Sequence, residues 1–179
     1  MSNAPLAALC LLPLGPALSA ALYALHNRSR DIADLRPARA FWRGYRLNLR
    51  DSLLVYVPWL VWLTIVAVGL GNLAAAGLPA WWAVLLVVVA VAATLWLANA
   101  LVICSLFAFR TLDVARLAAY FLVRTPGALL GNAGLLILAA AVTALSSEAV
   151  LALLGSALCA ALLRTSRPMV AVVRAEFVA

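Results

Sequence analysis

The feature that most limits the fold of this chain is the length of its uncharged segments. From Ser52 to Phe109 the sequence contains no acidic or basic residue. Hydrophobic residues make up 68% of the 179 residues and charged residues only 11%, whereas a soluble domain is about half apolar and about a quarter charged. A soluble fold could not cover this much apolar surface, so we expect an integral membrane protein.

Five segments are candidates for membrane-spanning helices, which need about 20 apolar residues each. They cover residues 5–25, 52–70, 81–109, 128–145 and 149–163. The last is short for a span, and Pro13, Gly15 and Pro16 interrupt the first, where freed backbone groups need other partners. We therefore predict an all-α transmembrane helical bundle of about five spans, with residues 1–179 forming a single membrane domain.

The basic residues are all arginine and fall into three groups, within residues 28–50, 110–124 and 164–174. With five spans, all 13 lie on one side of the membrane, while residues 71–80 and 146–148 on the other side carry none. Basic residues are retained on the cytoplasmic side. We therefore predict a cytoplasmic C-terminus and an N-terminus outside. The use of arginine without lysine, in an alanine- and leucine-rich chain, favours a bacterial inner (plasma) membrane.

Four arginines of the first group are separated by four, three and four residues, which places them on one face of a helix. This arginine stripe consists of Arg39, Arg43, Arg46 and Arg50. The other faces carry Phe41, Trp42, Tyr45 and Leu49. We expect an amphipathic helix along the cytoplasmic interface, starting near Pro37. The stripe either binds only anionic lipid headgroups or forms a docking surface for a partner protein.

A second basic segment has the same character. Arg116, Tyr120 and Arg124 follow at helical spacing before the fourth span, so we add Arg116 and Arg124 to the predicted contact surface. Arg167 and Arg174 extend the pattern to the C-terminus. Residues 38–109 and 113–163 would then form a weak parallel repeat, each unit being a basic interfacial helix followed by two spans.

Residue clusters typical of catalysis or metal binding are missing from the sequence. The only histidine, His26, has no acid or cysteine at ligand spacing. Cys10, Cys104 and Cys159 lie far apart in apolar segments, where we expect buried thiols. We predict a non-enzymatic protein without cofactor or metal. In so apolar a chain, the net charge of +7 matches anionic lipid headgroups better than nucleic acid.

Two asparagines lie within predicted spans, Asn99 in the third and Asn132 in the fourth. They either form hydrogen bonds between helices, worth on the order of 1 kcal/mol each, or line a path for a neutral solute. No ionisable residue lies near the middle of a span, which argues against a proton-coupled carrier. Pairs of small residues such as Gly127 and Gly131 predict close helix contacts.

Three segments resemble the YesL family of bacterial membrane proteins. They are LLPLGPALSAALYAL, FWRGYRLNLRDSL and FRTLDVARLAAYFLVRTP. The residues that carry the resemblance are Gly15, Pro16, Ala21, Leu22, Tyr23, Phe41, Trp42, Tyr45, Arg46, Asn48, Arg124 and Pro126. Members of this largely uncharacterised family are associated with ABC-type carbohydrate uptake, so the resemblance implies an accessory membrane component.

Two functions therefore stay open. The first is an accessory or scaffolding component of a bacterial ABC-type carbohydrate uptake system, whose partners are anionic lipids and transporter subunits. The alternative is a small transporter or channel for a neutral solute, with a path near Asn99 and Asn132. The sequence indicates neither the ligand, nor the identity of the partner, nor the oligomeric state.

Overall fold

The computed structural model describes residues 12–27, 37–73, 75, 77, 79–145 and 148–177. Helices dominate these residues, and the predicted all-α class is confirmed. The elements are α2 (Leu14–Asn27), α3 (Pro37–Asn72), α4 (Ala80–Leu106), α5 (Thr111–Arg124), α6 (Pro126–Leu145), α7 (Glu148–Thr165) and α8 (Arg167–Phe177). Cys10, Asp31, Asp34 and the first arginines, Arg28, Arg30 and Arg36, lie outside the described residues.

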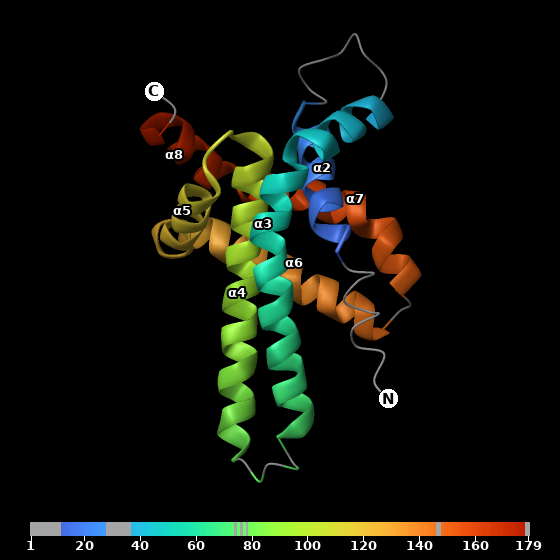
Figure 1. The fold of residues 1–179 in the computed structure, drawn as a ribbon, viewed down its shortest axis with the longest axis vertical. Coiled ribbons are helices and arrows are strands. Elements are labelled where there is room, and N and C mark those ends of the chain that lie inside the picture. The colour runs from blue at the N-terminus through green and yellow to red at the C-terminus, as the bar shows by residue number, and fades with distance from the viewer. Residues whose placement is uncertain are drawn as a thin grey trace.

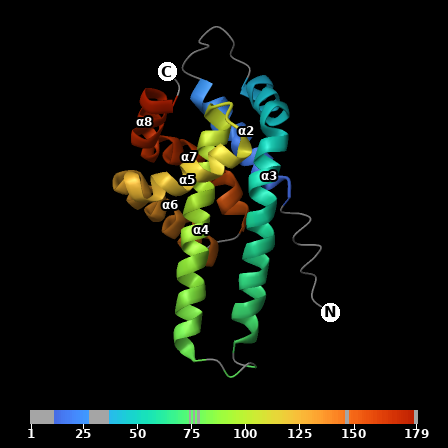
Figure 2. The ribbon, with the colours of Figure 1, turned by 60° about the vertical axis from the view of Figure 1, so that its left-hand side comes forward.

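The longest elements, α3 and α4, form an antiparallel hairpin (Figures 1 and 2). With 36 and 27 residues they are about 54 and about 40 Å long, more than the hydrocarbon core of about 30 Å. Their far halves project beyond the other helices as a stem. Large apolar side chains cover this stem, and Ile65 and Val84 are 64% and 63% exposed. An apolar surface of this extent is typical of a lipid-embedded segment.

The remaining helices are shorter, and two consecutive pairs of them meet at a bend. The axes of α5 and α6 differ by 98°, and those of α7 and α8 by 51°. Within the described ranges, two helices are long and apolar enough to cross a membrane, and each bent pair, if counted as one span, raises this number to at most four. The predicted number of five is therefore not confirmed. The predicted first span lies partly outside the described residues, and its described part, α2, has only 14 residues.

The predicted boundary between an interfacial helix and the second span is wrong. The arginine stripe and the following apolar segment form one uninterrupted helix, α3. Nothing in the stretch from Arg50 to Ser52 stops a helix, and Pro58 lies inside α3, as is tolerated in membrane helices. The first turns of α3 nevertheless lean away from the rest of the helix in Figure 1.

By contrast, the second basic segment is a separate helix, as predicted. Thr125 between α5 and α6 has φ −123° and ψ 74°, outside the helical region, because the proline that follows restricts its backbone. Pro126 then begins α6, where its missing N–H costs no intrahelical bond.

Helix α2 packs on the first half of α3 through two glycine–tyrosine contacts. A Cβ atom added to Gly15 of α2 would lie 2.5 Å from Cγ of Tyr56 in α3. A Cβ atom added to Gly44 of α3 would lie 2.7 Å from Cδ1 of Tyr23 in α2. Each helix thus supplies one glycine and one tyrosine, and only a residue without a side chain fits at both glycine positions.

The core lies at the junction of these helices, on the side of the molecule opposite the tip of the stem. Side chains from all seven described helices form it, including Leu22, Val55, Ile103 and Phe121. The ends of α2, α3, α4 and α5 are thereby held in one body. This body carries the charged surface described next.

Candidate interaction surface at the arginine end

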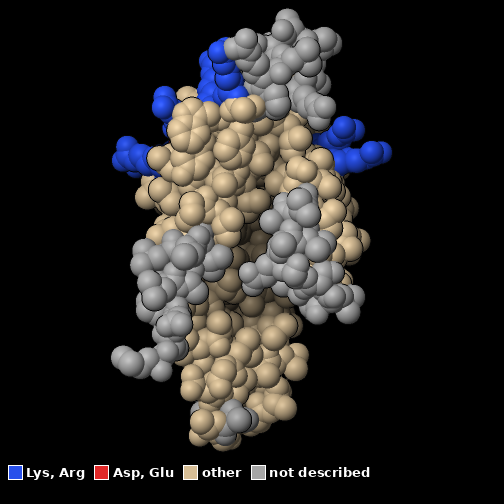
Figure 3. Space-filling model, turned by 90° about the vertical axis from the view of Figure 1, so that its right-hand side faces the viewer, with Lys and Arg blue, Asp and Glu red and all other residues tan. Residues whose placement is uncertain are grey.

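The described arginines occupy one part of the molecule. All of them are exposed: Arg39, Arg43, Arg46, Arg50, Arg110, Arg116, Arg124, Arg164, Arg167 and Arg174. In Figure 3 the basic side chains lie at the upper part of the visible face, and the stem below shows none. We call this part, where α3 begins and α4 ends, the arginine end.

The arginine stripe has the arrangement predicted from its spacing. Its four side chains are exposed, whereas Gly44, Ser52 and Val55 on the opposite side of α3 are buried. Within the part of the chain that the structure describes, no carboxylate forms an ion pair with these arginines. Four unpaired guanidinium groups therefore face the surroundings from one side of a helix.

Aromatic side chains accompany the stripe. Trp42 is 53% exposed, and its ring stacks on Tyr45 with a centroid distance of 5.6 Å. The Arg46 guanidinium lies 5.4 Å from the Trp42 ring centroid, within the range of a cation–π interaction. Tryptophan, tyrosine and arginine are typical of membrane interfaces and are also enriched at protein–protein interfaces.

Helix α5 adds a second basic face. Val114, Ala118 and Phe121 form its buried side, and Arg116 and Arg124 are exposed. Trp96 Nε1 of α4 donates a hydrogen bond to the Ala115 carbonyl oxygen at 3.0 Å, which fixes α5 against α4.

The start of α5 lies beside the end of the stripe. The Thr111 hydroxyl is 3.5 Å from Oδ1 of Asp51 in α3. Because α5 has 14 residues and is about 20 Å long, its last residue, Arg124, lies well away from this junction. The two basic faces therefore adjoin at one point and diverge from there.

The two asparagines that were predicted to lie within spans are brought together. Asn132 Nδ2 in α6 donates to Asn99 Oδ1 in α4 at 3.1 Å. Thr165 Oγ1 at the end of α7 donates to Asn132 Oδ1 at 2.6 Å. Asn99 and Asn132 are only 2% and 3% exposed. This polar chain joins three helices through two hydrogen bonds between buried or partly buried groups, which favours the packing interpretation over a solute path.

Sequence reasoning missed Thr165 as a member of this chain. Its approach depends on Gly131, because a Cβ atom added there would lie 2.8 Å from Thr165 Cβ. Of the predicted small-residue pair, Gly131 thus makes a close helix contact, whereas nothing lies within 4 Å of a Cβ atom added to Gly127. The signal available in the sequence was a glycine directly before a buried asparagine.

Most residues that carry the family resemblance take part in helix packing, in ring stacking or in the start of a helix. Gly15 and Tyr23 join α2 to α3, Pro16 is buried in the first turn of α2, and Pro126 begins α6. Phe41 stacks on Tyr45. Asn48 differs, because its Nδ2 atom is buried and has no hydrogen-bond partner among the described residues.

Among the described residues, no cluster of three His, Cys, Asp or Glu side chains could hold a metal ion. Cys104 and Cys159 are buried free thiols, as predicted. Cys10 lies outside the described residues.

Comparison with known families supports the resemblance seen in the sequence. Residues 4–70 match the family described as "Protein of unknown function, DUF624", to which YesL-like proteins belong. The match covers α2, the arginine stripe and most of α3, so it includes both glycine–tyrosine contacts. No curated protein and no solved structure matches the chain.

Proposed function

We propose that this protein is a non-enzymatic membrane component that assists another membrane system by docking through its arginine end. Its place among helical membrane proteins with a domain of unknown function follows from the apolar helices and the family match. The observation that supports docking is the arginine stripe, whose exposed guanidinium groups have no carboxylate partner in the described residues.

The chemistry of the stripe indicates the kind of partner. An acidic protein surface would pair with the guanidinium groups, and the exposed Trp42 ring would supply apolar contact at the same place. The resemblance to the YesL family supports a subunit of an ABC-type carbohydrate importer as this partner. Docking takes place at the cytoplasmic face, where we expect the arginine end to lie.

Anionic lipid is the competing occupant of the stripe. Each arginine near an anionic leaflet contributes about 1 kcal/mol, so the stripe alone could add about 4 kcal/mol of membrane attraction. Transport of a neutral solute, the other function left open by the sequence, gains no support from the buried hydrogen bond between Asn99 and Asn132.

Affinity purification from the native host distinguishes protein docking from lipid binding. The tagged protein is extracted in mild detergent, and co-purifying proteins are identified by mass spectrometry. In the test variant the stripe arginines are all changed to glutamine. A matched control loses the same charge from the same end of the molecule, at Arg110, Arg164, Arg167 and Arg174.

Importer subunits should accompany the wild type and the control but not the stripe variant. Membrane insertion of all three proteins is checked by carbonate extraction. Equal recovery of importer subunits with all three would remove the stripe as the docking surface. Purification of all three without such subunits would contradict the proposed partner and favour lipid as the occupant of the stripe.

A further inference from the structure

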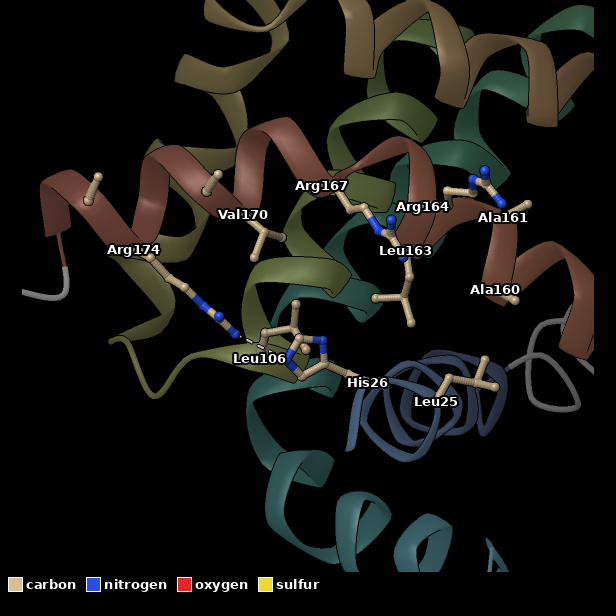
Figure 4. A pocket seen from close by; sticks show the side chains of 12 residues that line it. Leu25, His26, Leu106, Ala160, Ala161, Leu163, Arg164, Arg167, Val170 and Arg174 are labelled. Carbon is tan, nitrogen blue, oxygen red and sulfur yellow. Dashed lines mark hydrogen bonds between the residues drawn. The ribbon is translucent and has the colours of Figure 1, made fainter. Parts of the chain in front are cut away.

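A pocket of about 1130 Å³ opens at the arginine end between α7, α8 and the ends of α2 and α4. Figure 4 shows the corner between α7 and α8 arching over the end of α2. Arg164 and Arg167 lie together on one side of the pocket, and Arg174 reaches in from the other. This pocket is distinct from the arginine stripe, because none of the stripe residues lines it.

The lining combines two kinds of surface. Three arginines supply positive charge, and no carboxylate is among the lining residues that the structure describes. The walls between them are apolar, with Leu106 of α4 and Val170 of α8 near the middle in Figure 4. A ligand that satisfies both surfaces has an anionic head and a hydrocarbon body.

One arginine is held in place by a neighbour. Arg174 Nη2 lies 3.1 Å from Nε2 of His26, across the space between α8 and α2. Because a guanidinium group only donates hydrogen bonds, Nε2 of His26 is the acceptor. The bond positions Arg174 at the edge of the pocket, so its charge is directed before any ligand arrives.

Size and place identify the ligand further. Pockets for drug-sized molecules measure about 300–1,000 Å³, so this one is larger than a phosphate ion requires. It lies at the end of the bundle where α2 and α4 stop, and we expect lipid headgroups at the ends of helices that cross a bilayer. A free phosphate would contact the arginines and leave the apolar walls in water.

We propose that this pocket binds one anionic phospholipid. Its phosphate lies between Arg174 on one side and Arg164 and Arg167 on the other, and an acyl chain follows the apolar wall at Leu106 and Val170. The lipid would connect α8 to the ends of α2 and α4. This site is independent of the partner protein proposed above.

Native mass spectrometry of the detergent-solubilised protein tests the site, with phosphatidylglycerol and phosphatidylcholine as the probes. The test variant changes Arg164, Arg167 and Arg174 to glutamine. The matched control changes Arg39, Arg43 and Arg46 and removes the same charge outside the pocket. We expect the wild type to retain one phosphatidylglycerol. The pocket variant should bind it about a hundredfold more weakly, the factor expected for three lost phosphate contacts.

A second variant fills the space of the pocket without changing its charge. Ala160 is exposed and lines the pocket, so Ala160→Trp fills the space while all arginines remain. Phosphatidylglycerol should also be lost from this variant. An arm with inorganic phosphate identifies the source of the anion, since a lipid held by its chain as well as its head resists displacement by phosphate.

Three results would overturn the proposal. Equal loss from the pocket variant and the control would show attraction by overall charge. Equal retention of phosphatidylglycerol and phosphatidylcholine would show that the arginines do not select the head. Displacement by inorganic phosphate, with binding unaffected by Ala160→Trp, would assign the arginines to a soluble anion. None of these results depends on whether importer subunits bind the stripe.

Discussion

Gly15 and Gly44 each receive a tyrosine ring from the neighbouring helix. A methyl group at either position would overlap the Cβ and Cγ atoms of the tyrosine. These atoms cannot move away without moving the helix. The two contacts lie within the region that matches the DUF624 family. They give the motif residues Gly15 and Tyr23 a physical role in holding α2 on α3.

We predict that Gly44→Ala destabilises the protein by about 1–3 kcal/mol, the usual cost of overpacking a close contact. Thermal unfolding in detergent measures the loss. Gly127→Ala is the matched control, because nothing lies within 4 Å of the added Cβ atom. The contact at Gly44 would be refuted if both variants melted at the temperature of the wild type.

Removal of the tyrosine ring supplies a further check on the same contact. In the double variant Gly44→Ala with Tyr23→Ala, the ring atoms that overlap the added methyl group are absent, and only the contact with Cβ of residue 23 at 2.9 Å remains. We expect Gly44→Ala to cost less in that background than in the wild type. An unchanged cost would place the effect of Gly44 in the backbone of α3 rather than against Tyr23.

The asparagine chain leads to a prediction about access by water. Asn132→Cys, introduced into a variant without the native cysteines, should not react with a membrane-impermeant thiol reagent, because Asn132 is buried between α4 and α6. Arg43→Cys on the exposed stripe should react rapidly in the same permeabilised membranes. Rapid labelling at position 132 would instead indicate a water-filled path and revive the transport hypothesis.

Among the helices, the clearest difference from the sequence-based expectation concerns α3 and α5. Both were predicted as basic interfacial helices that precede a span, and α5 is separate whereas the stripe continues into α3. Pro126 explains why α5 ends before α6, since a proline disfavours a helical conformation in the residue before it. Pro58 has no comparable effect, because a proline inside a membrane helix is tolerated where neighbouring groups compensate.

The hydrogen bond between Trp96 and the Ala115 carbonyl connects α4 to α5. We predict that Trp96→Phe weakens this connection by about 1 kcal/mol and that the amides of α5 exchange faster with deuterium. Trp59→Phe is a matched control, because Trp59 Nε1 has no hydrogen-bond partner among the described residues. Equal exchange of α5 in both variants would show that the bond does not hold the helix.

Across the whole molecule, composition and arginine spacing predicted the class of protein, the stripe and the exposure of the basic residues. These properties follow from solvent preference and helical periodicity, which are local. The bends at Thr125 and Ser166, the glycine–tyrosine contacts and the pocket depend on how distant segments pack. The number of spans belongs to this second group, because each bent pair counts either as one span or as none.

The proposed arrangement that connects all these features is a bundle whose stem crosses the membrane and whose arginine end faces the cytoplasm. Labelling of single cysteines in intact and permeabilised cells tests it most directly. Ala75→Cys, exposed between α3 and α4, and Arg116→Cys, exposed on α5, are placed one at a time in a variant without native cysteines. An impermeant thiol reagent should label position 75 in intact cells and position 116 only after permeabilisation. Labelling of both positions from the same side, or the reverse order, would contradict this arrangement.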